Sequence, residues 1–225
     1  MASEQQNFKK SDQSKSTSSP PIPSAPTSQS DSSTSMGTWW SRLPKTQREN
    51  AQILVIALVL ALIIRLFVAE PRYIPSDSMV PTLEIGDRLV VEKVSYYLHP
   101  PSTGDIVVFE PPPQLLEYGY APDKAFIKRV IGTPGDVVQI SGGSVYLNGQ
   151  ILVEEYIAEA PAYELPPLRV PNDQLFVMGD NRNNSNDSHI WGFLPQQNVI
   201  GRAVFRFFPI DRIGWIMDRS NYSNK

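Results

Sequence analysis

The sequence predicts a mainly β protein built from antiparallel sheets, preceded by one N-terminal transmembrane helix and a disordered N-terminal tail. Three observations support this fold class: a long polar tail, one long apolar run at residues 51–68, and short β-type runs beyond it. Because turn residues and no long helical pattern separate these runs, we expect mainly antiparallel pairing. We therefore expect a polar tail with a membrane-proximal segment at 1–50, an anchor at 51–68 and a β domain at 70–218.

The composition argues against several classes of function. The chain has 225 residues and a formal net charge of -3, whereas proteins that bind nucleic acids usually carry a basic surface. We therefore expect no nucleic-acid partner. The chain contains no Cys, so disulfides, thiolate nucleophiles and Cys-ligated zinc are excluded. Only two histidines, His99 and His189, are available to a mechanism that needs an imidazole.

The N-terminal tail is the first element in chain order. Residues 1 to about 38 are Ser, Thr, Pro, Gln and Lys with almost no apolar content. Such a segment cannot bury enough surface to offset the entropy of ordering, so we interpret it as disordered. A partner-binding or regulatory tail is the alternative. Two tryptophans, Trp39 and Trp40, are followed by basic residues. This pattern suits a segment that lies at a membrane surface.

The anchor is predicted over residues 51–68, which are apolar except for Gln52 and Arg65. As a helix this run spans about 27 Å, enough to cross a bilayer core. A buried soluble helix would show a polar face, and a signal peptide rarely follows about fifty polar residues. The flanking charges weakly favour a cytoplasmic N-terminus, with three basic residues before the helix and two after it: Arg42, Lys45 and Arg48, then Arg72 and Arg88.

The β-type runs follow the anchor. The pair Asn148-Gly149, flanked by apolar runs, predicts a two-residue hairpin, and residues 137–172 are a possible appendage to the main domain. Pro111–Pro113 and Pro161–Pro171 indicate irregular loops or edges. Strands are expected at 88–94, 105–109, 126–131, 136–140, 175–178 and 199–208.

The segment Ile74–Leu83 contains two serines one residue apart, Ser76 and Ser78. If the segment is extended between its prolines, both hydroxyls point to the same side. In acyl transfer, one hydroxyl attacks a carbonyl and another donates a hydrogen bond to the oxyanion that forms. An ordinary Ser/Pro turn is the alternative interpretation.

A serine nucleophile needs a base, and three candidates exist. His99 lies in a loop where most histidines are merely solvated, while His189 would face the same way as Asp187 on a strand. Lys128 lies in a β run with apolar neighbours, where burial would lower its pKa from about 10.4 toward about 8. Alternation puts Lys128 and Arg129 on opposite faces, so we expect one to be buried and the other wet. A solvated lysine and a surface Asp-His pair remain the alternatives.

A polar loop at residues 179–189 gathers amides, carboxylates and hydroxyls directly after an apolar run. Such a loop is suited to orienting a buried lysine by hydrogen bonds, and a plain surface loop is the alternative. The sequence has no metal-ligand spacing, P-loop or dinucleotide fingerprint, so we expect no metal and no cofactor.

Together these stretches resemble the bacterial type I signal peptidases. The matching motifs occur in the family's order: Ile74–Leu83, Gly86-Asp87 with Val90–Lys93, Phe126–Gly132 with Pro134–Asp136, Gly179–Arg182 through Asp187-Ser188, and Gly201–Ala203. The resemblance implies a membrane-anchored Ser/Lys serine endopeptidase with the largely antiparallel β fold of that family. It also implies signal peptides of exported preproteins as substrates, cleaved after small residues, and membrane lipid as a partner.

The resemblance also implies roles for individual residues. Ser78 matches the nucleophile, Lys128 the general base and Ser76 the oxyanion-hole hydroxyl. Ser185 matches the serine that hydrogen-bonds the lysine, and Asp187 matches a structural acid. The positions that line the family's shallow apolar substrate pockets are Ile74, Pro75, Met79, Leu83 and Ile127.

The resemblance further implies a single-pass protein of the cell inner (plasma) membrane, with a cytoplasmic N-terminus and the catalytic domain outside the cytoplasm. Phe207, Phe208, Trp191 and Trp215 are expected either to rest on lipid or to pack in the core. The single anchor and acidic Asp77 resemble the photosynthetic-bacterial or thylakoid members, so a thylakoid membrane is the alternative location.

Three positions depart from the family pattern: Asp77, often glycine; Asn183, often aspartate; and His189, often arginine. The changes at Asn183 and His189 remove charges that the family usually pairs in this loop, so the sequence does not identify the partner of Asp187. His189 would suit Asp187 when it is protonated. A catalytically silent module that binds extended peptides is an alternative function. A self-cleaving Ser/Lys repressor is a third, but it would need a DNA-binding module where this chain has an apolar span.

Overall fold

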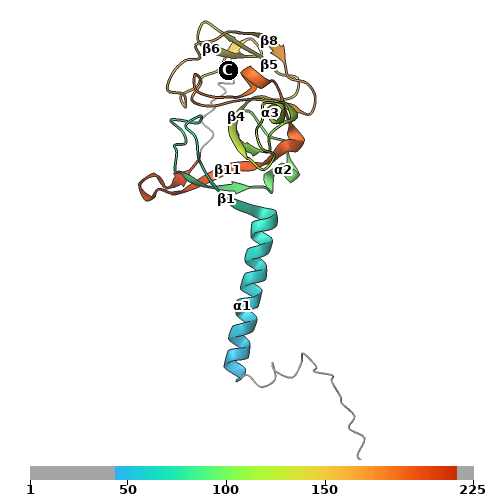
Figure 1. The fold of residues 1–225 in the computed structure, drawn as a ribbon, viewed down its shortest axis with the longest axis vertical. Helices are drawn as coiled ribbons and strands as arrows, with labels where there is room; N and C mark the ends of the chain where they lie inside the picture. Colours follow the sequence, from blue (N-terminus) through green and yellow to red (C-terminus); the bar gives the residue numbers. More distant parts are fainter. Residues whose placement is uncertain (1–43, 217–225) are drawn as a thin grey trace, which may run out of the picture. The chain divides into compact units, whose positions relative to one another are not determined.

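The computed structural model describes residues 44–216, so residues 1–43 of the tail predicted over 1–50 lie outside the described residues. Helix α1 (Lys45–Ile63) continues through a π-helical turn, η2 (Ile64–Val68), and neither buries a side chain (Figure 1). Within the part of the chain that is described, Lys45–Val68 is the one helix long and apolar enough to cross a membrane. The helix begins before the apolar run of the sequence, at Lys45.

The larger sheet contains eight strands in the order β1-β2-β11-β3-β4-β9-β10, with β12 added to β11, and every pair is antiparallel. The predicted antiparallel fold class is therefore confirmed. The strands are β1 (Ala69–Tyr73), β2 (Arg88–Glu92), β3 (Ile106–Phe109), β4 (Phe126–Gly132), β9 (Gln174–Met178), β10 (Leu194–Pro195), β11 (Val199–Phe208) and β12 (Gly214–Trp215).

A smaller antiparallel sheet has the order β7-β6-β5-β8. Its strands are β5 (Val137–Ser141), β6 (Ser144–Leu147), β7 (Gln150–Ile151) and β8 (Leu165–Arg169). The predicted hairpin joins β6 to β7, and both of its turn residues have positive φ, 54° at Asn148 and 80° at Gly149. Two-residue hairpin turns of the most favoured type require this conformation at both positions.

Four strands were not predicted from the sequence: β1, β8 and the two-residue strands β10 and β12. The two longer ones, β1 and β8, contain proline. Strand β1 includes Pro71, and strand β8 includes Pro166 and Pro167. Each strand pairs on one side only, with β2 and β5 respectively. Proline cannot donate to a ladder but is tolerated at a sheet edge, where one side needs no partner. The Pro161–Pro171 stretch is thus an edge strand with irregular flanks.

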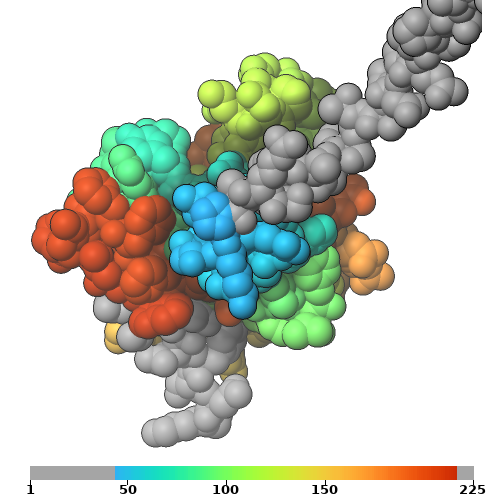
Figure 2. Space-filling model, turned by 90° about the horizontal axis from the view of Figure 1, so that it is seen from below, coloured from blue at the N-terminus to red at the C-terminus, as the bar shows by residue number. Residues whose placement is uncertain are grey.

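Short helices connect the strands: α2 (Ser95–Leu98), α3 (Pro113–Glu117), α4 (Ser188–Trp191), and the 3-10 turns η3 (Gln196–Asn198) and η4 (Ile210–Arg212). Between β11 and β12 the chain carries exposed apolar side chains. The red lobe of Figure 2 contains this segment, in which Ile210 and Trp215 are 79% and 71% exposed. Trp191 is instead buried in the core at 5% exposure.

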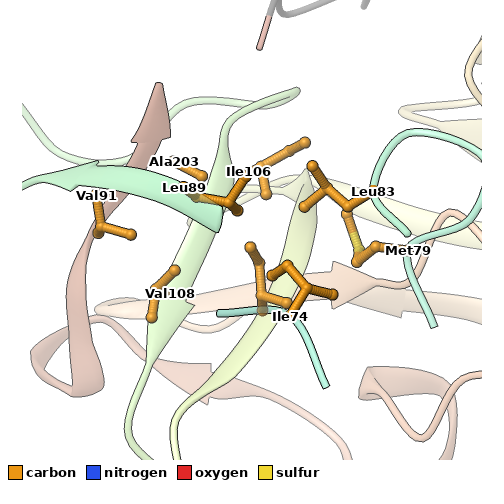
Figure 3. Close-up of a cluster of buried hydrophobic side chains, with 9 residues drawn as sticks. Ile74, Met79, Leu83, Leu89, Val91, Ile106, Val108 and Ala203 are labelled. Carbon is orange, nitrogen blue, oxygen red and sulfur yellow. The ribbon is translucent and has the colours of Figure 1, made fainter. Parts of the chain in front are cut away.

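The core of the larger sheet lies on both of its faces. Along β3, Ile106 and Val108 belong to one buried cluster, and Val107 and Phe109 to another. Since side chains alternate along a strand, these clusters cover opposite faces. The first cluster, called here the front cluster, is shown in Figure 3 and comprises Ile74, Met79, Leu83, Leu89, Val91, Ile106, Val108, Ile127 and Ala203.

Candidate active site

The segment Ile74–Leu83 folds as turns and not as the extended strand that the sequence analysis assumed. The N-H of Val80 donates to the carbonyl of Asp77 at 3.0 Å, and the N-H of Leu83 donates to that of Met79 at 2.9 Å. These local bonds replace pairing with a sheet. Ser76 and Ser78 nevertheless approach each other, with 3.4 Å between their Oγ atoms. Ser76 is exposed, whereas Ser78 is 8% exposed.

Lys128 lies on β4 and reaches the serine segment directly. Its Nζ is 2.7 Å from Ser78 Oγ and donates to the carbonyl of Ile127 at 3.0 Å. Lys128 is 4% exposed, and its neighbour Arg129 is 1% exposed. The expectation that one of the two would be wet is wrong, because β4 pairs with β3 and β9 and has a packed cluster on each face.

Burial lowers the pKa of Lys128 to about 8. The penalty for placing an ammonium among apolar neighbours is the largest contribution, while the carboxylates of Asp187 and Asp180 oppose it by stabilising the charged form. A pKa near 8 leaves a useful fraction of the amine neutral close to neutral pH. A neutral amine 2.7 Å from a hydroxyl has the geometry and the basicity to accept its proton.

The buried charge of Arg129 is neutralised beside this pair. Its Nε and Nη2 donate to the two carboxylate oxygens of Asp180 at 2.8 and 2.7 Å, and Nη1 donates to the carbonyl of Gly104 at 2.9 Å. Asp180 also accepts the hydroxyl of Thr82 at 2.5 Å. One ion pair therefore connects three elements: the strand of Lys128, the segment of Ser78 and the polar loop 179–189.

A second buried ion pair joins the polar loop to the connection between β7 and β8 of the smaller sheet. Arg182 donates to both oxygens of Glu154 at 2.7 and 2.6 Å, and the Tyr156 hydroxyl donates to Glu154 at 2.7 Å. The guanidinium of Arg129 lies 3.9 Å from the centre of the Tyr156 ring. The region 137–172 is consequently part of the support of the site, since residues 154–156 contact both buried arginines.

The sequence analysis did not identify Glu154 or Tyr156. No local sequence pattern distinguishes these two residues. Their contacts form only when the connection between β7 and β8 packs against β4. Arg129 and Asp180 lie within the predicted strand and the predicted polar loop, so their positions were available from the sequence. Their pairing was not, since it joins residues 51 apart in the chain.

The polar loop packs tightly against the serine segment at Gly179. An added Cβ on Gly179 would overlap Ser185 Oγ and the carbonyl oxygen of Ser78. The backbone N-H of Asn181 donates to that same Ser78 carbonyl at 3.1 Å. Ser185 Oγ is buried and has no hydrogen-bond partner among residues 44–216. The structure thus places Ser185 against the Ser78 backbone, with its hydroxyl available for a partner.

Asp187 caps α4 and binds His189, which lies two residues further along. Its Oδ1 is 2.7 Å from His189 Nδ1, and its Oδ2 accepts the N-H of Gly179 at 2.9 Å. The His189 ring stacks on Tyr163 with 4.0 Å between ring centres. The Nδ1 atom of His189 is therefore engaged by Asp187. The other candidate histidine, His99, is exposed. Among residues 44–216, the Ser78 hydroxyl lies within hydrogen-bond distance of Lys128 and Ser76.

The proposed pocket residues separate into two groups. Ile74, Met79, Leu83 and Ile127 belong to the front cluster, and Met79 and Leu83 have no exposed surface (Figure 3). Pro75 is exposed. The contact of the four buried residues with a substrate stays a prediction. Among residues 44–216 there is no group of three or more His, Asp or Glu side chains that could hold a metal ion.

Comparison with known proteins gives consistent matches. Residues 47–208 match the family described as signal peptidase, peptidase S26. A probable signal peptidase I-1 of Synechocystis sp. is 67% identical over 167 residues, 74% of this chain and 85% of that protein. A probable thylakoidal processing peptidase 2 of Arabidopsis thaliana is 42% identical over 187 residues, which are 83% of this chain and 51% of that protein.

Among solved structures, a signal peptidase I from Enterococcus faecalis is similar, with a TM-score of 0.39 and 30% sequence identity. The match covers 46% of this chain and 97% of that chain.

Proposed function

This chain belongs to the signal peptidase family S26, a family of serine endopeptidases, and we propose that it is a membrane-anchored enzyme that removes signal peptides from exported preproteins. We propose Ser78 as the nucleophile and Lys128 as its general base. The observation that carries the proposal is the 2.7 Å contact between Ser78 Oγ and the Nζ of Lys128, which is buried on strand β4.

The reaction follows from this geometry. Neutral Lys128 takes the Ser78 proton as Oγ attacks the carbonyl carbon of the scissile bond. The oxyanion then receives hydrogen bonds from the Ser76 hydroxyl and the backbone N-H of Ser78. Protonated Lys128 gives its proton to the leaving amine, which leaves an acyl ester on Ser78. Water attacks this ester with Lys128 again as base, and release of the acid regenerates Ser78.

Ser185 and Asp187 have supporting roles in this proposal. Ser185 orients Lys128 during the reaction, which the unpartnered, buried hydroxyl beside the Ser78 backbone supports. Asp187 holds the polar loop through Gly179 and His189. Its negative charge also stabilises the Lys128 ammonium that forms in the first step.

The substrate requirement is a small residue before the scissile bond. The apolar surface that receives this small residue is formed or supported by Ile74, Pro75, Met79, Leu83 and Ile127. The support for this proposal is packing: Met79 and Leu83 are completely buried in the front cluster, which therefore offers no deep opening for a large side chain.

The anchor is Lys45–Val68, with the N-terminus in the cytoplasm and the β domain on the opposite side of the plasma membrane or of a thylakoid membrane. The helix is long and apolar enough to cross a bilayer, and it buries no side chain in the protein. Ser78 follows Val68 by only ten residues, which would keep the nucleophile near the membrane surface. A signal peptide that lies in the same membrane would then meet Ser78 at a higher effective concentration than a substrate free in solution.

The test uses the full chain in liposomes with a preprotein that ends its signal peptide in small-X-small. Wild type is expected to release the mature protein, while Ser78→Ala and Lys128→Ala each abolish release. Ser144→Ala in the hairpin and exposed Lys124→Ala are the matched controls and retain activity. Cleavage that persists in Ser78→Ala or Lys128→Ala would refute the proposed dyad. Membrane-impermeant labelling of tags at the two termini tests the orientation.

A further inference from the structure

A single acidic side chain lies between the two serines of the site. Asp77 separates Ser76 from Ser78, so its Cα is about 3.8 Å from the Cα of each. Asp77 is exposed, and it forms no ion pair among the residues that the structure describes. Its charge is therefore uncompensated by the protein and faces solvent directly beside the proposed nucleophile.

The position of this carboxylate is held by two asparagines of the polar loop. Asn184 Nδ2 donates to Asp77 Oδ2 at 2.9 Å. Asn181 binds two successive backbone carbonyls. Its Nδ2 donates to the carbonyl of Asp77 and its N-H donates to the carbonyl of Ser78, each at 3.1 Å. Because both the backbone and the carboxylate of Asp77 are held, its charge keeps one position relative to Ser78.

The other charged groups of the site do not cancel this charge at the surface. Asp180 is buried against Arg129, and Asp187 is buried against His189. Lys128 is itself buried and must be neutral to act as the base. In the reactive form, Asp77 therefore gives the surface around Ser78 a negative potential.

We propose that Asp77 determines substrate specificity by charge, favouring preproteins with basic residues and disfavouring those with acidic residues just after the scissile bond. The inference rests on the proposed function. We assign the selection to the mature side because the residue that supplies the scissile carbonyl is small and uncharged. The nearest position to Ser78 at which substrates can differ in charge is then the first residue after the bond.

The expected size of the effect follows from the electrostatics of an exposed charge. Two unit charges about 8 Å apart interact only weakly at an exposed site. The interaction energy corresponds to a change in kcat/KM of about two- to tenfold for each charge on the substrate. Salt weakens such interactions, since the screening length falls from about 30 Å at 0.01 M to about 3 Å at 1 M ionic strength. The selectivity is therefore expected to decrease as salt increases.

The test measures kcat/KM of the full chain in detergent with matched peptides that carry Lys, Gln or Glu at the first or second position after the bond. Asp77→Asn keeps the shape and the capacity to bind Asn184 but removes the charge. It is expected to lower the Lys-to-Glu ratio about fivefold at 20 mM salt, with little difference from wild type at 500 mM. Asp77→Glu keeps the charge and is expected to keep most of the ratio.

A matched control removes one charge elsewhere. Glu117 is exposed at the end of α3, and among the described residues no hydrogen bond or ion pair joins it to the Ile74–Leu83 segment or to the polar loop. Glu117→Gln is expected to leave the Lys-to-Glu ratio unchanged. An equal fall in Glu117→Gln, or an unchanged ratio in Asp77→Asn with cleavage intact, would overturn this inference alone. Absence of cleavage of every peptide by wild type would overturn the proposed function, and this inference with it.

Discussion

Arg129 holds Asp180 through two hydrogen bonds of 2.8 and 2.7 Å, and both side chains are almost completely buried. The pair lies directly beside Lys128 and joins the three segments that form the site. A buried ion pair adds little net stability compared with apolar residues, but the loss of one partner leaves the other charge uncompensated. Its main consequence here is that the segments of Ser78, Lys128 and Ser185 must keep one relative arrangement.

The first prediction concerns this ion pair. Asp180→Asn is expected to lower the free energy of unfolding by about 3 kcal/mol or more, because it removes the carboxylate that accepts hydrogen bonds from both Nε and Nη2 of buried Arg129. Urea unfolding of the detergent-solubilised full chain measures it. The control is Glu84→Gln, which removes a partner of Arg212 where Glu84 is 55% exposed, and is expected to cost less than about 1 kcal/mol. Equal losses in the two variants would contradict the prediction.

The second prediction concerns pH. Because Lys128 must be neutral to act as the base and its pKa is about 8, kcat/KM is expected to rise with pH and reach half of its maximum near pH 8. Asp187 raises this pKa, so Asp187→Asn is expected to move the midpoint to lower pH. Asparagine remains a good helix cap, which preserves the start of α4. A midpoint that moved upward in Asp187→Asn, or a wild-type midpoint near 10, would exclude Lys128 as the titrating base.

The third prediction concerns Gly179. Gly179→Ala is expected to lower stability by about 1–3 kcal/mol and to reduce kcat, since its Cβ would displace Ser185 and the Ser78 carbonyl. Gly214→Ala is the matched control, because nothing lies within 4 Å of a Cβ added there. Thermal melting and preprotein cleavage compare the two variants. A harmless Gly179→Ala would mean that the loop and the serine segment are not in close contact.

The fourth prediction concerns Ser185, whose hydroxyl is buried without a partner among the described residues. Ser185→Ala removes no hydrogen bond from the resting site, so the melting temperature is expected to stay the same or rise slightly. If Ser185 orients Lys128 during the reaction, kcat falls while KM changes little. A purely structural role would instead lower the melting temperature and leave kcat unaltered in the folded protein.

Local elements were easier to predict from the sequence than the contacts between distant segments. The apolar run predicts a helix because its composition leaves no polar face, and the hairpin at Asn148-Gly149 is predicted because few residues tolerate positive φ twice in succession. Strands β1 and β8 were missed because proline normally argues against a strand, and only the finished sheet order shows that both lie at edges.

The sequence by itself determined the antiparallel β class, the apolar helix, the membership of the signal peptidase family and the identity of the candidate residues, because each of these depends on residue type and local spacing. The tertiary structure alone decided that Arg129 is as buried as Lys128, that Ser76 and Ser78 lie in a turn, and that Glu154 and Tyr156 contact the buried arginines. These features depend on which segments pack together, and contacts between distant parts of a chain leave no periodic pattern in its sequence.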